Sequence, residues 1–207
     1  MRDHVLNSEP AGPTAADIVA ALGRRSVVLV GMMGAGKSSV GRRLATRLGL
    51  PFVDADSEIE NAHRMTIPEI FDTYGEPYFR AGEVRVIARL LDGGPQVLAT
   101  GGGAVMNADT RAAIREKGIS FWLKADFDLL VRRIKRRTDR PMLRTADPEA
   151  TLKELMALRD PFYAQADVTV HSSDIPHDKI VDEIVSNLAA RVGVAVLPPA
   201  AKESDRS

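Results

Sequence analysis

The feature that most constrains the fold is the glycine-rich octapeptide GMMGAGKS at residues 31–38, which fits the pattern GxxxxGK[ST] at every fixed position. An apolar run at 26–30 precedes it and a helical pattern at 39–48 follows, which is the strand, loop and helix context that a phosphate-binding loop requires. Glycines let successive backbone N–H groups point at one phosphate, and the helix N-terminus adds the positive end of its dipole. In such a loop Lys37 reaches the β- and γ-phosphates of a nucleotide and Ser38 ligates Mg²⁺.

Short apolar runs alternate with helical patterns along the rest of the chain. The runs expected to be strands are 26–30, 52–54, 96–100, 119–123 and 168–171. Strands separated by helices form parallel sheets that helices cover on both faces. We therefore predict a three-layer α-β-α domain, with a short helix at 14–22 before it and with helix N-caps at Thr66, Asn107 and Asp126.

Composition excludes several classes of protein. The chain has no cysteine, which excludes disulfides, zinc held by cysteine and thiol catalysis. It has 28 basic and 28 acidic residues. A balanced charge gives no global field for nucleic acid or for an anionic membrane, and the apolar runs are far shorter than a membrane helix. We expect a cytoplasmic monomer with neither nucleic-acid nor membrane partners.

Two related nucleotide-binding folds fit less well. A dinucleotide frame GxGxxG that starts at Gly34 meets Ser39 where the third glycine should stand. A GTPase needs a polar residue at the start of its base-reading segment, and the nearest match, LKAD at 123–126, begins with Leu123.

Three further segments carry candidate chemistry. Asp54 and Asp56 are two residues apart at the end of the second expected strand, so both should face the cleft, although such pairs are also common as strand-end turns or caps. Three glycines at 101–103 favour close approach of the backbone to a ligand over a flexible turn. The basic run at 132–140 is either a solvated helix face or a phosphate-binding lid, and its lack of aromatic residues disfavours nucleic acid.

The phosphate loop, the aspartate pair and several later motifs together resemble the shikimate kinase family over about residues 25–190. The later motifs are EIF at 69–71, GEPYFR at 75–80, GGG at 101–103, RP at 140–141 and RDPFY at 159–163. The resemblance implies a five-stranded parallel sheet of the nucleoside-monophosphate-kinase type, with a substrate-binding excursion at about 55–92 and a lid at about 132–148. It also implies Mg²⁺-dependent transfer of the γ-phosphoryl group of ATP to the 3-hydroxyl of shikimate, within chorismate and aromatic amino acid biosynthesis.

The resemblance assigns roles by position. It implies that ATP is bound by Gly34, Ala35, Gly36, Lys37, Ser38, Ser39, Arg133 and Arg140, and shikimate by Asp56, Arg80, Gly102 and Arg159. The implied metal ligands are Ser38 and, through water, Asp54, and the implied catalytic residues are Lys37, Asp56 and Arg140. The sequence leaves open whether Asp56 takes the proton of the acceptor hydroxyl or only positions it.

We expect the chain to have three parts. These are a partly mobile extension at 1–24, a P-loop kinase domain at 25–192 and a disordered tail at 193–207. Two alternatives remain open at this stage: a kinase of the same fold that acts on gluconate or a nucleoside monophosphate, and a non-catalytic nucleotide-binding switch.

Overall fold

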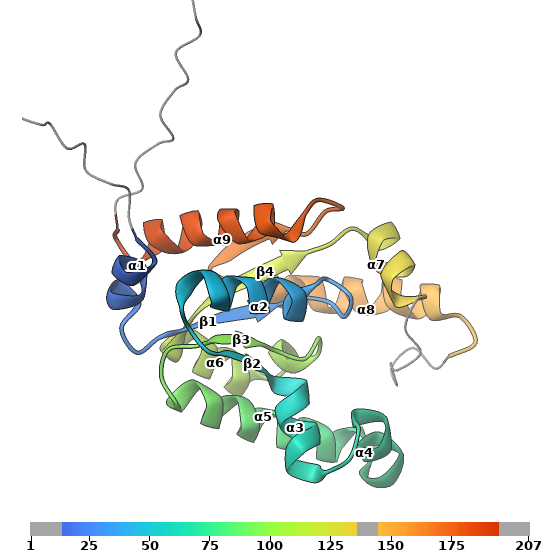
Figure 1. Ribbon diagram of the computed structural model, residues 1–207. Helices are drawn as coiled ribbons and strands as arrows, with labels where there is room; N and C mark the ends of the chain where they lie inside the picture. The colour runs from blue at the N-terminus through green and yellow to red at the C-terminus, as the bar shows by residue number, and fades with distance from the viewer. Residues whose placement is uncertain (1–13, 136–144, 195–207) are drawn as a thin grey trace, which may run out of the picture.

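A five-stranded parallel sheet forms the centre of the computed structural model, which describes residues 14–135 and 145–194 (Figure 1). The strand order is β2-β3-β1-β4-β5, and every neighbouring pair is parallel. The strands are β1 (Ser26–Val30), β2 (Phe52–Asp54), β3 (Val97–Ala99), β4 (Gly118–Lys124) and β5 (Val168–His171). The predicted sheet is confirmed, with β3 one residue shorter and β4 one residue longer at each end than expected.

Helices cover both faces of this sheet. The helices α1 (Ala15–Leu22), α2 (Lys37–Leu48) and α9 (His177–Arg191) lie over one face, whereas α5 (Glu76–Asp92) and α6 (Ala108–Lys117) lie over the other (Figure 1). Beside α6 lies α8 (Pro148–Tyr163), where the Arg111 guanidinium is 4.8 Å from the ring centre of Phe162. The three-layer α-β-α architecture is therefore confirmed. Among the described residues, no helix is long and apolar enough to cross a membrane.

The core lies between the sheet and these helices. Every residue of β1 is buried, as expected for a central parallel strand with helices on both faces. From α1, Ile18 and Leu22 also join this core, and they are only 2% and 1% exposed. The N-terminal helix is thus packed onto the domain, and the domain limit at 24/25 stays a prediction.

Most of the expected helix starts are present. Thr66 forms a capping box with Glu69 at the start of α4 (Ile67–Tyr74), and the Asn107 side chain accepts two backbone N–H groups of α6. Asp126 stands at the N-cap of α7 (Phe127–Ile134), but its side chain makes no capping hydrogen bond. The loop leads directly into α2, which starts at residue 37 and not at 39.

A small second core lies away from the sheet. Ile59 of α3 (Ala55–His63), Ile70 of α4 and Phe79 of α5 pack together there. Figure 1 shows α3 and α4 projecting beyond the sheet, and these helices occupy the segment in which the substrate-binding excursion is predicted. The two cores are joined by α5, because Ile87 and Leu91 of the same helix pack in the main core.

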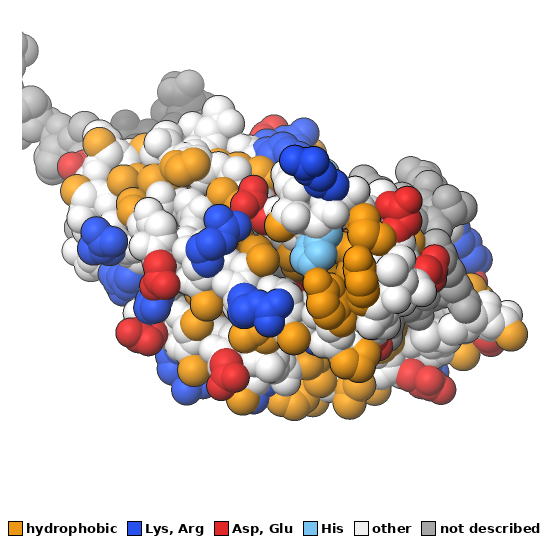
Figure 2. Space-filling model, turned by 90° about the horizontal axis from the view of Figure 1, so that it is seen from below, with side chains coloured by type: hydrophobic (Ala, Val, Ile, Leu, Met, Phe, Trp, Pro, Cys, Tyr) orange, Lys and Arg blue, Asp and Glu red, His pale blue; other side chains and the backbone are white. Residues whose placement is uncertain are grey.

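The underside of the molecule in Figure 1 mixes charged and apolar side chains. Figure 2 shows acidic and basic side chains scattered over this face, with hydrophobic side chains gathered toward one part of it. Tyr74 and Tyr78, from α4 and α5, are 51% and 43% exposed, and their ring centres are 4.7 Å apart.

Candidate active site

The phosphate loop joins β1 to α2 at the carboxyl edge of the sheet, where ligands bind in open α/β folds. Gly36 is the N-cap of α2 and has a left-handed backbone with φ of 97°, which residues with a Cβ atom adopt only at a cost. The buried Lys37 ammonium donates hydrogen bonds to the carbonyl oxygens of Gly31 and Met32, at 2.7 and 3.0 Å. It therefore lies along the loop, close to any phosphate that the loop N–H groups bind.

Oxygen ligands for a divalent cation lie next to the loop. The Ser38 hydroxyl donates to a carboxylate oxygen of Asp54, 2.6 Å away. Mg²⁺ prefers such oxygens, and in kinase sites it takes most other ligands from phosphates and water. Across residues 14–135 and 145–194, no group of three or more histidine or acidic side chains could hold a metal. Two such oxygens beside a phosphate-binding loop fit a cation that a nucleotide brings with it.

Asp56 reaches this place by a different route from the predicted one. We expected Asp54 and Asp56 to share one face of β2, but the strand ends at Asp54 and Asp56 lies in the first turn of α3. The cause is local, because Asp54 accepts the backbone N–H of Asp56 at 3.1 Å and caps the helix. Both carboxylates still line one cavity, and the N-terminus of α3 favours the negative charge of Asp56.

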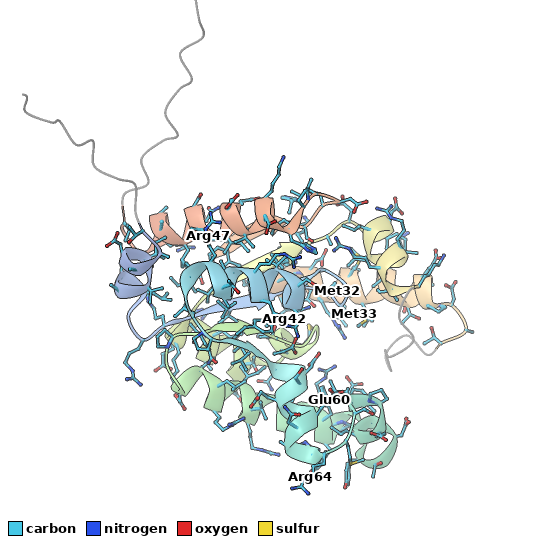
Figure 3. The ribbon with its side chains drawn as sticks, viewed as in Figure 1. Met32, Met33, Arg42, Arg47, Glu60 and Arg64 are labelled. Carbon is cyan, nitrogen blue, oxygen red and sulfur yellow. The ribbon has the colours of Figure 1, made fainter. Side chains whose placement is uncertain are left out.

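Two cavities meet at these residues. The phosphate-loop cavity, of about 340 Å³, is lined by the loop and by Arg133 and His177. The arginine cavity, of about 410 Å³, is lined by α3, α4 and α5 and by Arg159. Figure 3 labels Met33 in the loop and Glu60 on α3, and both line the arginine cavity. The residues common to both cavities are Met33, Ser38, Asp54, Asp56 and Gly102. Molecules bound in the two cavities would therefore meet at the aspartate pair.

A buried ion pair forms one wall of the arginine cavity. Arg80 Nη1 lies 2.7 Å from a carboxylate oxygen of Glu83, and Arg80 Nε lies 3.1 Å from Glu76. Glu83 is 2% exposed, and burial raises its pKa against the opposing effect of Arg80 and Arg159. Within the described residues, Oε1 of Glu83 and Nε of Arg159 are buried without a hydrogen-bond partner. A buried polar atom without a partner destabilises the folded protein.

The three glycines after β3 bring the backbone against these side chains. A Cβ atom on Gly101 would overlap Oε1 of Glu83 and would lie 2.8 Å from Oδ1 of Asp56. A Cβ atom on Gly103 would lie 2.7 Å from the Arg80 guanidinium. We predicted close approach to a ligand at this segment, and the structure shows close approach to the charged side chains of the cavity itself.

Two side chains of α8 hold the carbonyl oxygen of Gly102. Arg159 Nη1 donates to it at 3.2 Å, and the Tyr163 hydroxyl also donates to it. Tyr163 stacks on Trp122 of β4, with ring centres 5.8 Å apart, and burial raises the pKa of Tyr163 to about 12. The phenol therefore keeps its proton at neutral pH and remains a donor, which fixes Gly102 and the arginine beside it.

Arg133, on α7, lies against the other side of the loop. Its Nη1 donates to the Gly34 carbonyl at 3.1 Å and is 3.5 Å from the Ser172 hydroxyl, which itself donates to the Ala35 carbonyl. We did not predict the serine contact. The implied contact of Arg133 with ATP stays a prediction, and Arg140 lies outside the described residues.

Comparison with known proteins decides the family, because the shikimate kinase family model matches residues 33–189. The chain belongs to the shikimate kinase family. The shikimate kinase of Rhodopseudomonas palustris is 66% identical over 176 residues, which cover 85% of this chain and 87% of that protein. The shikimate kinase of Bradyrhizobium diazoefficiens is 62% identical over 187 residues, 89% of this chain and 90% of that protein.

Solved structures agree with this assignment. The shikimate kinase from Acinetobacter baumannii in complex with shikimate has a TM-score of 0.79 at 37% identity, and the match covers 81% of this chain and 94% of that one. A gluconokinase from Sinorhizobium meliloti has a TM-score of 0.58 at 22% identity, which shows the fold alone. As a shikimate kinase family member, the chain is an ATP-dependent kinase, and the open alternatives of a gluconate or nucleotide kinase and of a non-catalytic switch are disfavoured.

The structure gathers most of the sequence-predicted residues around the two cavities. Those that line one or both are Gly34, Gly36, Lys37, Ser38, Ser39, Asp54, Asp56, Arg80, Gly102, Arg133 and Arg159. Ala35 is fully buried and lines neither cavity. Sequence reasoning missed Glu83, although a signal was available, because Glu83 interrupts the buried stripe formed by Phe79, Ile87 and Leu91 at intervals of four residues on α5.

Proposed function

We propose that this kinase binds ATP and Mg²⁺ in the phosphate-loop cavity and shikimate in the arginine cavity, and transfers the γ-phosphoryl group to the 3-hydroxyl of shikimate. One observation carries the proposal: the arginine cavity and the phosphate-loop cavity are both lined by the aspartate pair. The arginine cavity is the one walled by Arg80, Glu83 and Arg159. The shikimate complex of the relative from Acinetobacter baumannii supports the same acceptor. The product feeds chorismate and aromatic amino acid biosynthesis.

On the nucleotide side, the loop N–H groups and Lys37 hold the phosphates. Ser38 would ligate Mg²⁺ directly, and Asp54 would hold it through a water molecule. When bound, Mg²⁺ would offset the negative charge that develops during transfer. Arg133 contributes a positive charge from the opposite side of the loop, and Arg140 is proposed to meet the transferring phosphoryl group.

On the acceptor side, the chemistry of shikimate fits the arginine cavity. Shikimate has one carboxylate and three ring hydroxyls. The guanidinium groups of Arg80 and Arg159 can fork onto a carboxylate, and the Gly102 backbone lies beside them. Asp56, where the two cavities meet, accepts a hydrogen bond from the reacting hydroxyl and holds its oxygen in line with the γ-phosphorus.

The rate would come from alignment and from charge placed in advance. Phosphoryl transfer requires little covalent work from the protein. A substrate held in the reactive geometry avoids most of the entropy loss of a bimolecular encounter. Fixed charges such as Lys37 act where negative charge develops, without reorganisation during the reaction.

Several expectations from the sequence stay predictions. These are the domain limits 25–192, the excursion at about 55–92, the lid at about 132–148, the monomeric state, the cytoplasmic location and the absence of nucleic-acid and membrane partners. The excursion is supported by the separate small core of α3, α4 and α5. The predicted extension at 1–24 and tail at 193–207 fall largely outside the described residues.

Phosphorus NMR of the reaction products tests the proposal. With ATP, Mg²⁺ and shikimate, we expect a phosphate monoester signal that is split by the single proton on ring carbon 3, together with ADP. Inorganic phosphate and ADP without a phosphate monoester would indicate hydrolysis and contradict the proposed transfer. An ester at another ring hydroxyl would contradict the proposed orientation of the acceptor.

A further inference from the structure

His177 is a titratable side chain of the phosphate-loop cavity to which the mechanism above gives no role. It is the first residue of α9, which runs beside α2 with both N-termini at the same end of the sheet (Figure 1). A Cβ atom built on Gly36 would lie 3.8 Å from Nε2 of His177 and 3.6 Å from Nη1 of Arg133. The imidazole and the guanidinium therefore flank the N-terminus of α2, where the loop binds phosphate.

The surroundings of this ring oppose its protonation. Burial is the largest cause that lowers the pKa of His177, and the charges of Arg43 on α2 and Arg133 on α7 lower it further, whereas Asp178 raises it. Asp178 is itself 3.7 Å from Arg43 and mostly exposed. The other charged residues that line the cavity are Lys37, Arg42, Asp54 and Asp56. The phosphates of a nucleotide would add negative charge close to the ring and so favour its protonated form.

We propose that His177 is a nucleotide-binding residue whose Nε2 contacts an anionic group of the bound nucleotide and takes up a proton as that nucleotide binds. The inference rests on the proposed function, because it requires ATP or ADP in the loop. Binding coupled to proton uptake weakens as pH rises, over the range between the pKa of His177 in the free protein and its higher pKa in the complex.

Calorimetry with ADP and Mg²⁺ tests this inference on the full chain. Titrations in two buffers of different ionisation enthalpy, at about pH 7, give the number of protons taken up on binding. The variant is His177→Gln, which keeps a hydrogen-bond donor but cannot titrate, and the matched control is His171→Gln, because His171 is exposed on β5 and lines neither cavity. Proton release or uptake by ADP itself is common to the three proteins and cancels in the comparison.

We expect the wild type and His171→Gln to take up more protons than His177→Gln. A rise of about one unit in the pKa of His177 would make ADP affinity fall about tenfold more between low and high pH in the wild type than in His177→Gln. Equal proton uptake and equal pH dependence in the three proteins would overturn the inference while leaving the proposed function intact, provided that all three release ADP from ATP with shikimate. Failure of the wild type to bind ADP would overturn both.

A second measurement uses the wild type and does not depend on the affinity of a variant. The Cε1 proton signal of His177, assigned by its absence from the spectrum of His177→Gln, reports the pKa of the ring in a pH titration. We expect this pKa to rise when ADP and Mg²⁺ are added. An unchanged pKa at saturating ADP would overturn the inference.

Discussion

Replacement of Arg80 by alanine should lower both the unfolding free energy of the protein and its affinity for shikimate, and the two effects are measured separately. Glu83 is 2% exposed and its carboxylate lies 2.7 Å from Arg80. Removal of one partner of a buried ion pair costs about 3–5 kcal/mol, because the other charge is left buried and unpaired. Burial already raises the pKa of Glu83, so this carboxyl can take up a proton in the variant. We therefore expect a loss of unfolding free energy at the lower end of that range.

Arg89 supplies the matched control on the same helix. It pairs with Glu58 at 3.0 Å, but its side chain is 63% exposed, so Arg89→Ala should cost only about 0–1 kcal/mol. Urea unfolding at neutral pH, followed by circular dichroism, compares the two variants. Addition of Glu83→Gln to Arg80→Ala should recover part of the lost stability, because it removes the unpaired carboxyl.

The same variants separate the two cavities in a kinetic assay. The KM for shikimate should rise about 10- to 150-fold in Arg80→Ala, which corresponds to about 1.5–3 kcal/mol for a hydrogen bond to a charged group. The KM for ATP should stay unchanged, and Glu83→Gln should not restore shikimate affinity. A stability loss no larger than that of Arg89→Ala would refute the burial argument. A raised KM for ATP with an unchanged KM for shikimate would refute the division of the cleft.

Three further substitutions test other parts of the site. Lys37→Ala should lower kcat by about 100-fold or more in a coupled ADP assay, because a charge fixed at the transferring phosphate is lost, and an unchanged kcat would remove this residue from the mechanism. Gly101→Ala should raise the KM for shikimate and lower the unfolding free energy, because its Cβ atom would overlap Glu83; if neither changes, the close packing is wrong. Tyr163→Phe should weaken the alkaline loss of stability. An unfolded tyrosine ionises near pH ~10, whereas burial raises the pKa of Tyr163 in the folded protein to about 12. The contribution of Tyr163 to the free energy of unfolding is therefore complete below pH ~10. Above pH ~10 that contribution falls by about 1.4 kcal/mol per pH unit. Equal alkaline slopes in denaturant titrations of the two proteins would contradict this account.

The sequence predicted the features that depend on local patterns. The phosphate loop has fixed spacing and is flanked by its strand and helix, and Lys37 and Ser38 line the phosphate-loop cavity. Thr66 and Asn107 cap their helices as expected, because an N-cap depends on residues within one turn. The aspartate pair shows the limit of this reasoning. Asp54 can continue a strand or cap a helix, and its bond to the backbone of Asp56 decides for the cap.

The contacts that hold the site together could not be predicted, because they join distant parts of the chain. Ser172 binds the carbonyl of Ala35, and Tyr163 binds that of Gly102. No local pattern encodes which backbone oxygen a side chain meets across the sheet. Glu83 was accessible in principle, since a carboxylate in a buried helical stripe indicates a partner or a ligand. Its partner Arg80 lies one turn away on the same helix, whereas the charge of Arg159, which also acts on Glu83, comes from α8 and has no local signal.

The most direct test of the central claim is release of ADP from ATP and Mg²⁺ by the full chain with different acceptors. The acceptors compared are shikimate, gluconate and a nucleoside monophosphate, each over a range of concentrations, with a reaction without acceptor as the control. The paired arginines of the arginine cavity match a carboxylate, and the shared aspartate matches a hydroxyl. Because the chain also belongs to the shikimate kinase family, we predict saturable ADP release with shikimate and only background release with the others. Turnover with gluconate or a nucleoside monophosphate, and none with shikimate, would contradict the account.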